Sequence, residues 1–322
     1  MSTTSPTTIS IVGAAGTVGS SIAFSLILNP IAGEIILSDP QTEIVQAQAE
    51  DLRDAILQSD TTSTRVHVAE SPSEAGQADI IIITAGAAQK KGESRTDLVG
   101  KNAKILKSVA EGLGEVKKEA VVICVANPVD VMTFFAQKFI NLPKKQIFGS
   151  GTFLDSARLK GQLAKQIGVS QSNIEAFVLG EHGESQVVAW SAVSVGGVAL
   201  DRIEQNSNVN IDRDEISEQT KDKAGAIIEG KGTTNYGIGA VVGSICKAVL
   251  FDQRVIRPVS HWNEGLGVCL SMPAVIGREG LVRSVEVPGL SEEEMGRVRK
   301  SAESLRSVVG EAEKVLEEGE GK

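Results

Sequence analysis

The sequence predicts an α/β protein that begins with a doubly wound parallel sheet and continues into a second, α+β domain. Short, almost wholly apolar runs alternate with helical patterns in the first half. Such runs are typical of parallel strands covered on both faces, and their alternation with helices indicates βαβ units. The length of 322 residues suits two domains, and the texture of the sequence changes after about Gly149.

The expected elements follow from these patterns. Strands are expected over Thr8–Val12, Glu34–Ser38, Arg65–Ala69, Ile80–Thr84 and Val121–Val125, with helices over Thr17–Leu28 and from Thr42 to about Gln58. After the change of texture we expect a helix over Thr152–Ile167, strand-like segments over Val187–Leu200 and Gly265–Pro273, surface loop and helix over Asn206–Lys223, and a last helix from Ser291. Ser291 and Glu294 form a candidate capping box for that helix, and its acidic end after Leu316 is expected to fray.

Composition narrows the classes of function. Lys and Arg number 32 against 41 Asp and Glu, giving a net charge of −9, which argues against nucleic acid because phosphate binding needs basic patches. Three scattered cysteines suit a reducing compartment and predict neither a disulfide framework nor a metal site. No apolar stretch approaches the roughly 20 residues of a membrane span, and the first basic residue is Arg53. We therefore expect no leader, no membrane contact and a cytoplasmic location.

A glycine-rich turn follows the first expected strand and precedes a helix. Gly16 there permits close approach of a pyrophosphate to the helix N-terminus, and Gly19 permits close packing of the helix on the strand. Asp39, at the end of the second expected strand, suits the ribose hydroxyls of NAD and would repel the extra phosphate of NADP. The alternatives are an ordinary turn between core elements and a helix N-cap at Asp39.

Candidates for a proton carrier are few, because the chain has only three histidines. His67 falls in an alternating strand and His261 in a polar segment expected to be a loop, so both are interpreted as structural. Asp155 and Arg158 share one face of an expected helix, where a surface ion pair is the simple alternative. In the functional interpretation, Asp155 orients His182 and stabilises its imidazolium, while Arg158 binds a substrate carboxylate.

Two polar segments follow later strands. Residues 85–95 contain glycines and basic side chains and leave the carboxyl end of a strand, where ligands bind in doubly wound folds. This composition suits a lid, with a solvated loop as the alternative. Asn127, before Pro128, is placed either to bond a substrate oxygen or to fix the peptide geometry, with a cis bond as one form.

Together these motifs resemble the NAD-dependent L-lactate/malate dehydrogenase family, most closely its L-lactate dehydrogenases. The matching segments are GESR at 92–95, NPVD at 127–130, GSGTFLDSAR at 149–158 and GEHGES at 180–185. They run in the family's order, within a likeness that extends from Ile9 to about Gly280. The resemblance implies a Rossmann-type NAD-binding domain over residues 1–149 and an α+β catalytic domain over residues 150–322.

The resemblance also implies a role for each site residue. His182 becomes the proton donor and acceptor, Asp155 its partner, and Arg95 a group on a closing loop that polarises the reacting carbonyl. The implied substrate-binding residues are Gln89, Arg95, Asn127, Arg158 and Thr234. The implied NAD-binding residues are Gly13, Gly16, Val18, Gly19, Asp39, Gly86, Ala87, Val125, Asn127, Ser150 and Ile238.

The expected reaction is hydride transfer between NADH and pyruvate to give (S)-lactate. The family discriminates between substrates at the position of Gln89, where an arginine would pair with the second carboxylate of oxaloacetate. Neutral Gln89 leaves that carboxylate unpaired, which favours pyruvate. Malate dehydrogenase, or another L-2-hydroxy acid dehydrogenase, is the alternative, because Lys90 or Lys91 reaches the pocket after a one-residue shift of register and the spacing of the turn glycines is that of malate dehydrogenases. A catalytically silent dinucleotide-binding protein is disfavoured by the presence of all the catalytic side chains.

Assembly and regulation are also implied by the resemblance. The helix near residues 42–58 matches the helix of the family's dimer contact. Only about eight residues precede the first expected strand, so a homodimer or a weaker homotetramer is expected. Members activated by a sugar bisphosphate carry a basic residue and a histidine where this chain has Lys160 and Glu175. Glu175 would repel a phosphate, so activation by fructose bisphosphate is not expected.

Overall fold

The computed structural model describes residues 6–57, 63–87, 95–207, 209–287 and 289–320. In this part of the chain, the main element is a 9-stranded sheet of order β14-β13-β12-β6-β5-β4-β1-β2-β3. The section from β6 to β3 is parallel, with the strand order of a doubly wound dinucleotide-binding fold. The expected parallel α/β sheet is therefore confirmed.

The elements of the first half agree closely with expectation. The strands are β1 (Thr8–Val12), β2 (Glu34–Ser38), β3 (Arg65–Val68), β4 (Ile80–Ile83), β5 (Val121–Cys124) and β6 (Ile147–Gly149). The helices are α1 (Thr17–Leu28), α2 (Thr42–Leu57), α3 (Pro72–Ala75), α4 (Arg95–Leu113) and α5 (Val129–Phe139), followed by the 3-10 turn η1 (Lys144–Gln146). Strands β3, β4 and β5 each end one residue earlier than expected.

The second half mixes helices with short antiparallel strands. Its helices are α6 (Phe153–Ile167), α7 (Leu200–Asn206), α8 (Arg213–Lys231), α9 (Tyr236–Leu250) and α10 (Glu292–Glu320), with 3-10 turns η2 (Gln171–Asn173) and η3 (Trp190–Ala192). Its strands are β7 (Ile174–Glu175), β8 (Val178–Leu179), β9 (Val187–Val188), β10 (Ser194–Val195), β11 (Val198–Ala199), β12 (Val255–Asn263), β13 (Val268–Gly277) and β14 (Gly280–Ser284).

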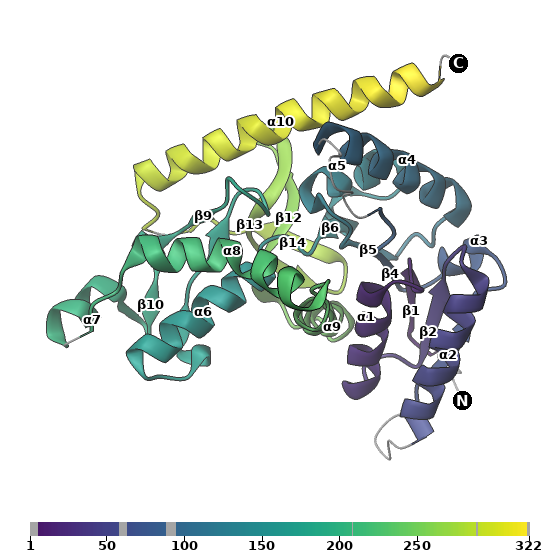
Figure 1. Cartoon of the computed structure of the whole chain (residues 1–322), viewed down its shortest axis with the longest axis horizontal. Helices are drawn as coiled ribbons and strands as arrows, with labels where there is room; N and C mark the ends of the chain where they lie inside the picture. Colours follow the sequence, from purple (N-terminus) through teal and green to yellow (C-terminus); the bar gives the residue numbers. More distant parts are fainter. Residues whose placement is uncertain (1–5, 58–62, 88–94, 208, 288, 321–322) are drawn as a thin grey trace.

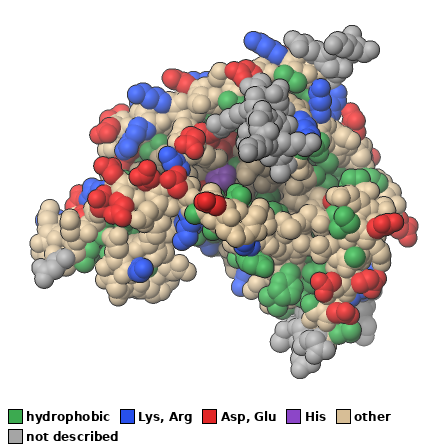
Figure 2. All heavy atoms as spheres, viewed as in Figure 1, with side chains coloured by type: hydrophobic (Ala, Val, Ile, Leu, Met, Phe, Trp, Pro, Cys, Tyr) green, Lys and Arg blue, Asp and Glu red, His purple; other side chains and the backbone are tan. Residues whose placement is uncertain are grey.

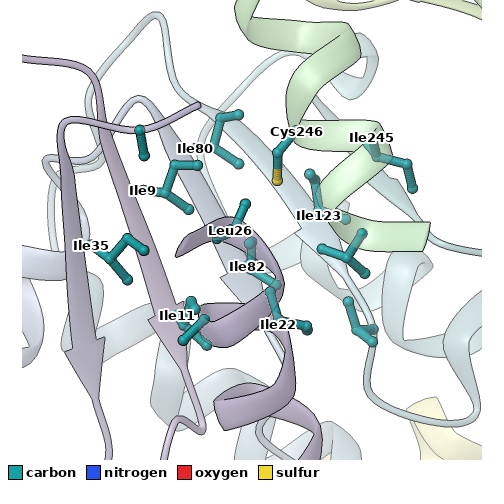
Figure 3. Packing of buried hydrophobic residues seen from close by; sticks show 14 of the residues in the cluster. Ile9, Ile11, Ile22, Leu26, Ile35, Ile80, Ile82, Ile123, Ile245 and Cys246 are labelled. Atoms are coloured by element: carbon teal, nitrogen blue, oxygen red, sulfur yellow. The ribbon is translucent and has the colours of Figure 1, made fainter. Parts of the chain in front are cut away.

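The sheet lies between two hydrophobic cores. Ile80 and Ile82 of β4 face one core with α1 and α9, while Ile81 and Ile83 face the other with α4, α5 and α10. Figure 3 shows the first core, where Ile9, Ile82 and Cys246 come from β1, β4 and α9. Successive side chains of a strand point to opposite faces, which explains why these strands are apolar throughout.

Two helices of the second half cover the sheet of the first half. Helix α9 packs along α1, and α10 runs across α4 and α5 at the top of Figure 1. The expected capping box is confirmed at the start of α10, where the Glu294 amide donates to Ser291 Oγ (3.2 Å) and the Ser291 amide to Glu294 Oε2 (3.0 Å). The helix continues to Glu320 instead of fraying after Leu316.

Two expectations for the second half are corrected and one is confirmed. The strand-like segment 187–200 is broken into short strands, by the 3-10 turn η3 and by Gly196 and Gly197, which turn the chain with positive φ angles. The polar stretch 206–223 contains non-helical chain and then a helix, α8, as expected, and the helix extends beyond it to Lys231. His261 lies buried in β12 rather than in a loop. It can be buried there because its two ring nitrogens form hydrogen bonds with Val259 O and Ser284 Oγ.

Candidate active site

A cleft of 790 Å³ opens beyond the carboxyl ends of β1, β2 and β4. The order of the sheet reverses between β1 and β4, and ligands bind at such switch points in open α/β sheets. The cleft, called here the glycine cleft, is lined by these of the expected NAD-binding residues: Gly13, Gly16, Asp39, Gly86 and Ala87.

The glycines of the turn serve different purposes. Gly13 has a φ of +93°, and a Cβ there would lie 2.6 Å from the Ala85 amide nitrogen. A Cβ on Gly19 would lie 2.6 Å from Gly13 O, so this glycine permits the close packing of α1 on β1. A Cβ on Gly16 would meet only Gly13 O, at 3.4 Å. Gly16 therefore leaves open space at the N-terminus of α1, where a phosphate is favoured.

Asp39 forms part of the wall of the glycine cleft. Its Oδ2 accepts the Ala15 amide at 3.1 Å and its Oδ1 accepts the Gln41 amide at 2.9 Å. Helix α2 begins only at Thr42, so Asp39 is not its N-cap. A carboxylate oxygen has further lone pairs, so the fixed carboxylate can accept ribose hydroxyls, and the cleft fits an NAD-type dinucleotide.

A smaller pocket of 110 Å³, called here the histidine pocket, lies beyond β5 and β6. Figure 2 shows a hollow in the molecular surface with a histidine side chain inside it. The pocket is also lined by Leu154 of α6, Ala224 and Ile228 of α8, and Val241 of α9. It brings together these expected site residues: Val125, Asn127, Ser150, Arg158, His182, Thr234 and Ile238.

Asp155 joins the two charged groups of the pocket. His182 Nδ1 donates to Asp155 Oδ2 at 2.6 Å, and Arg158 Nη1 donates to Asp155 Oδ1 at 3.0 Å. The Asp155 and Arg158 side chains are only 3% and 7% exposed, so the alternative of a surface ion pair is wrong. Asp155 lies in the first turn of α6, where the helix dipole also favours a negative charge.

The electrostatics of this network favour a charged pair. Burial lowers the pKa of His182, but the Asp155 carboxylate more than offsets this effect, and the pKa of His182 is raised above its ordinary value. Burial raises the pKa of Asp155, but His182 and Arg158 outweigh it, and the pKa of Asp155 is lowered. The imidazolium and the carboxylate therefore stabilise each other in the pocket.

Sequence patterns missed the side chains that hold these groups in place. Asn102 of α4 is 1% exposed, accepts the Ala87 amide at 2.7 Å and donates to Asn127 O at 2.8 Å. The Asn127–Pro128 bond that follows is cis, one of the geometries considered from the sequence. The Ser156 hydroxyl accepts the Val178 amide at 2.9 Å and thereby ties β8 to α6. These bonds link distant segments, so no local motif reveals them.

The loop that carries Thr234 is anchored to the first helix of the chain. Asn235 Nδ2 donates to Ser21 Oγ at 2.7 Å, and the hydroxyls of Thr17 and Thr233 lie 3.4 Å apart. Because α1 directly follows the glycine turn, this contact joins the wall of the histidine pocket to that of the glycine cleft.

Comparison with known protein families identifies both halves of the chain. Residues 7–149 match the lactate/malate dehydrogenase NAD binding domain, and residues 152–316 match the lactate/malate dehydrogenase alpha/beta C-terminal domain. The chain belongs to the lactate/malate dehydrogenase family. It is therefore an NAD-dependent oxidoreductase, and the expected NAD-binding Rossmann domain and second domain are confirmed.

Individual members of the lactate/malate dehydrogenase family resemble the chain over most of its length. L-Lactate dehydrogenase A of Rhizopus oryzae is 43% identical over 96% of this chain and 94% of its own length. An L-lactate dehydrogenase of Streptococcus sanguinis is 39% identical over 92% of both chains. A lactate dehydrogenase from a Medee basin deep-sea metagenome has a similar structure, with a TM-score of 0.91 and 29% identity over 95% of this chain and 99% of its own.

Some site residues that the resemblance implies either lie outside the described residues or line neither cavity. Gln89, Lys90 and Lys91 lie outside the described residues, and Arg95 begins α4 with its side chain outside them. Val18 and Gly19 line neither cavity. Val18 packs against the first hydrophobic core, and Gly19 lies against Gly13 O, where α1 packs on β1. In the described part of the chain, no helix is long and apolar enough to cross a membrane, and no cluster of His, Cys, Asp and Glu offers a metal site.

Proposed function

We propose that this chain is an L-lactate dehydrogenase, which reduces pyruvate with NADH to (S)-lactate and catalyses the reverse reaction. The observation that carries the proposal is the buried His182–Asp155–Arg158 network in a small pocket. It supplies a proton carrier and a carboxylate-binding group together. The names of the relatives, which match nearly the whole chain, support pyruvate and lactate as the substrates.

Arg158 is the group that we assign to the substrate carboxylate. One of its nitrogens is bound by Asp155, and its remaining N–H groups suit a planar carboxylate. Asn127 and Thr234 line the same pocket and are assigned to substrate contacts. We assign Arg95 to stabilise the charge that develops on the carbonyl oxygen.

Bound NADH supplies the hydride in this reaction. His182 holds the transferred proton at Nε2, because its Nδ1 is bonded to Asp155. Reduction needs protonated His182, which donates to the carbonyl oxygen, and oxidation needs neutral His182, which accepts from the hydroxyl. Since the pKa of His182 is raised, reduction should persist to a higher pH than an ordinary histidine allows, then fall as pH rises further.

NAD binding is assigned to residues 1–149 and substrate binding mainly to residues 150–322. Within the first, the glycine cleft takes the dinucleotide, with Asp39 at the ribose and Gly16 at the pyrophosphate. The other residues assigned to NAD are Gly13, Gly86, Ala87, Val125 and Asn127 of this domain, together with Ser150 and Ile238 beyond it. Val18 and Gly19, which line neither cavity, are assigned to the packing of α1. We propose a cytoplasmic location, which agrees with three buried free cysteines.

We also propose a homodimer or homotetramer. Large apolar side chains are exposed on α1 and α2, where a protein surface usually carries polar groups. They are Phe24, Leu28, Ile44 and Leu57, of which Leu57 is 77% exposed. An apolar surface on the helix that resembles the family's dimer contact favours a second copy as its cover.

The deciding experiment is the initial rate of NADH oxidation with pyruvate and with oxaloacetate, measured side by side. We expect a strong preference for pyruvate, because neutral Gln89 leaves a second carboxylate unpaired. Preference for oxaloacetate would contradict the proposal and indicate that Lys90 or Lys91 reaches the pocket. The variants Lys90→Gln and Lys91→Gln would then identify the responsible cation.

A further inference from the structure

Asp130 is a buried carboxylate that the proposed mechanism does not use. It lies in the first turn of α5 and is 2% exposed. Its Oδ2 accepts the backbone amide of His182 at 2.8 Å. Its Oδ1 is buried and makes no hydrogen bond within the described part of the chain. His182 is thus held by two carboxylates, one on its ring and one on its backbone.

The contact also connects two parts of the histidine pocket. Helix α5 begins at Val129, directly after the Asn127–Pro128 peptide, so its second residue, Asp130, lies close in the chain to Asn127, which lines the pocket. His182 lies on the loop after β8, in the second half of the chain. Asp130 therefore fixes the backbone of His182 relative to Asn127, whereas Asp155 binds its ring.

We propose that Asp130 is a positioning residue for His182: its carboxylate fixes the His182 backbone, and its negative charge favours the protonated ring. For its effect on turnover, this inference rests on the proposed function. For its effect on the proton affinity of His182, it stands on the contact alone.

The surroundings leave Asp130 charged while His182 titrates. Burial raises the pKa of Asp130 to about 6, although the Ser260 hydroxyl and His182 oppose it and Glu181 adds to it. The pKa of His182 is raised above its ordinary 6.5, so Asp130 is largely ionised when His182 loses its proton. Among the described residues, the other ionisable groups that act on the pair are Asp155 and Arg158 of α6 and Cys269 of β13. The Cys269 thiol stays neutral, because burial raises its pKa.

Two variants separate the bond from the charge. Asp130→Asn keeps an acceptor for the His182 amide and removes the charge, so we expect most of the turnover to survive below the His182 midpoint. That midpoint should move to lower pH by roughly half a unit or more. Asp130→Ala removes the acceptor as well, and turnover should fall on the order of 10- to 100-fold, with NADH affinity unchanged.

Asp79→Asn is the matched control. Asp79 also accepts a backbone amide, that of Thr8 at 2.9 Å, but at the opposite end of the parallel strands. This variant should leave both the midpoint and turnover as they are in the wild type. A shift of the same size in Asp79→Asn would overturn the inference, because it would mean that the charge of any carboxylate in this domain has the effect.

The midpoint is measured directly, by titration of the His182 ring in NMR spectra of the full chain. Only three histidines are present, so a His182→Gln sample assigns the signal. An unshifted midpoint in Asp130→Asn overturns the inference, whether or not Asp130→Ala folds. Absence of pyruvate reduction in the wild type would overturn the proposed function instead, and the NMR midpoint would still decide the role of Asp130.

Discussion

The glycine cleft and the histidine pocket are lined by different kinds of residues. The cleft is lined by glycines and by mostly uncharged side chains, and the Asp39 carboxylate in its wall is fixed by backbone amides. The pocket is formed by side chains of distant segments, and its charges are buried and joined to each other. A substitution in the cleft should therefore change cofactor affinity, whereas one at His182, Asp155 or Arg158 of the pocket should impair turnover or pyruvate binding and leave cofactor affinity nearly intact.

The largest effect is expected for His182→Ala. Loss of the proton carrier should lower kcat on the order of 10³- to 10⁴-fold. The NADH dissociation constant, measured by fluorescence titration, should stay within about twofold, because His182 lies outside the glycine cleft. His67→Ala is the matched control, since His67 pairs with Glu74 at the edge strand β3. Full turnover in His182→Ala would contradict the proton-carrier role.

Asp155→Asn should act through the pKa of His182. The Asp155 carboxylate raises that pKa, so its loss lowers it, and a smaller fraction of His182 is protonated at neutral pH. Pyruvate reduction at neutral pH should fall about 100-fold or more, and the pH at which it declines should move downward. Lactate oxidation needs neutral His182, so its lower pH limit should move downward as well. Rate profiles in both directions measure this, and fixed limits would contradict the pairing.

Arg158→Lys tests carboxylate recognition. Lysine keeps the charge but lacks the planar fork, and it leaves Asp155 with a poorer partner. The KM for pyruvate should rise on the order of 100-fold, with a smaller change in NADH affinity. Arg213→Lys is the control, because Arg213 pairs with Asp201 and Glu204 away from the pocket. Equal losses of NADH and pyruvate binding in Arg158→Lys would break the distinction between the two cavities.

Two glycines of one turn sharpen the comparison within the cleft. A Cβ on Gly16 would meet only Gly13 O, at an ordinary contact distance of 3.4 Å, and would enter the cleft, so Gly16→Ala should weaken NADH binding about tenfold and leave the melting temperature nearly unchanged. A Cβ on Gly19 collides with Gly13 O at 2.6 Å, so Gly19→Ala should lower the melting temperature. Calorimetry and NADH titration of both variants test the difference. The reverse pattern would show that Gly16 serves the fold and Gly19 the cofactor.

The same contrast explains what sequence alone can reveal. The bounds of α1 and β1 and the positions of Gly16 and Asp39 follow from local patterns, because periodicity and turn chemistry act over a few residues. The grouping of His182 with Arg158 follows from recognisable motifs. Asn102 and Asp130 escape such reasoning, since their partners lie on segments far away in the chain. The polar neighbours of His261 suggest a loop, whereas the structure places it in β12, where two hydrogen bonds satisfy its ring.

The last prediction is that a sugar bisphosphate has no effect on the enzyme, because of an ion pair that lies outside both cavities. Lys160 of α6 pairs with Glu175 of β7 at 3.1 Å, so the charge of the lysine is already neutralised. A phosphate bound beside Lys160 would also be repelled by the Glu175 carboxylate. Fructose bisphosphate should therefore leave the pyruvate half-saturation unchanged. Glu175→Ala removes the repulsion and frees Lys160, while an exposed pair of this kind contributes less than about 1 kcal/mol to stability. A lower half-saturation with fructose bisphosphate in the wild type would sink the prediction. Activation confined to Glu175→Ala would identify the ion pair as the reason that the effector has no effect.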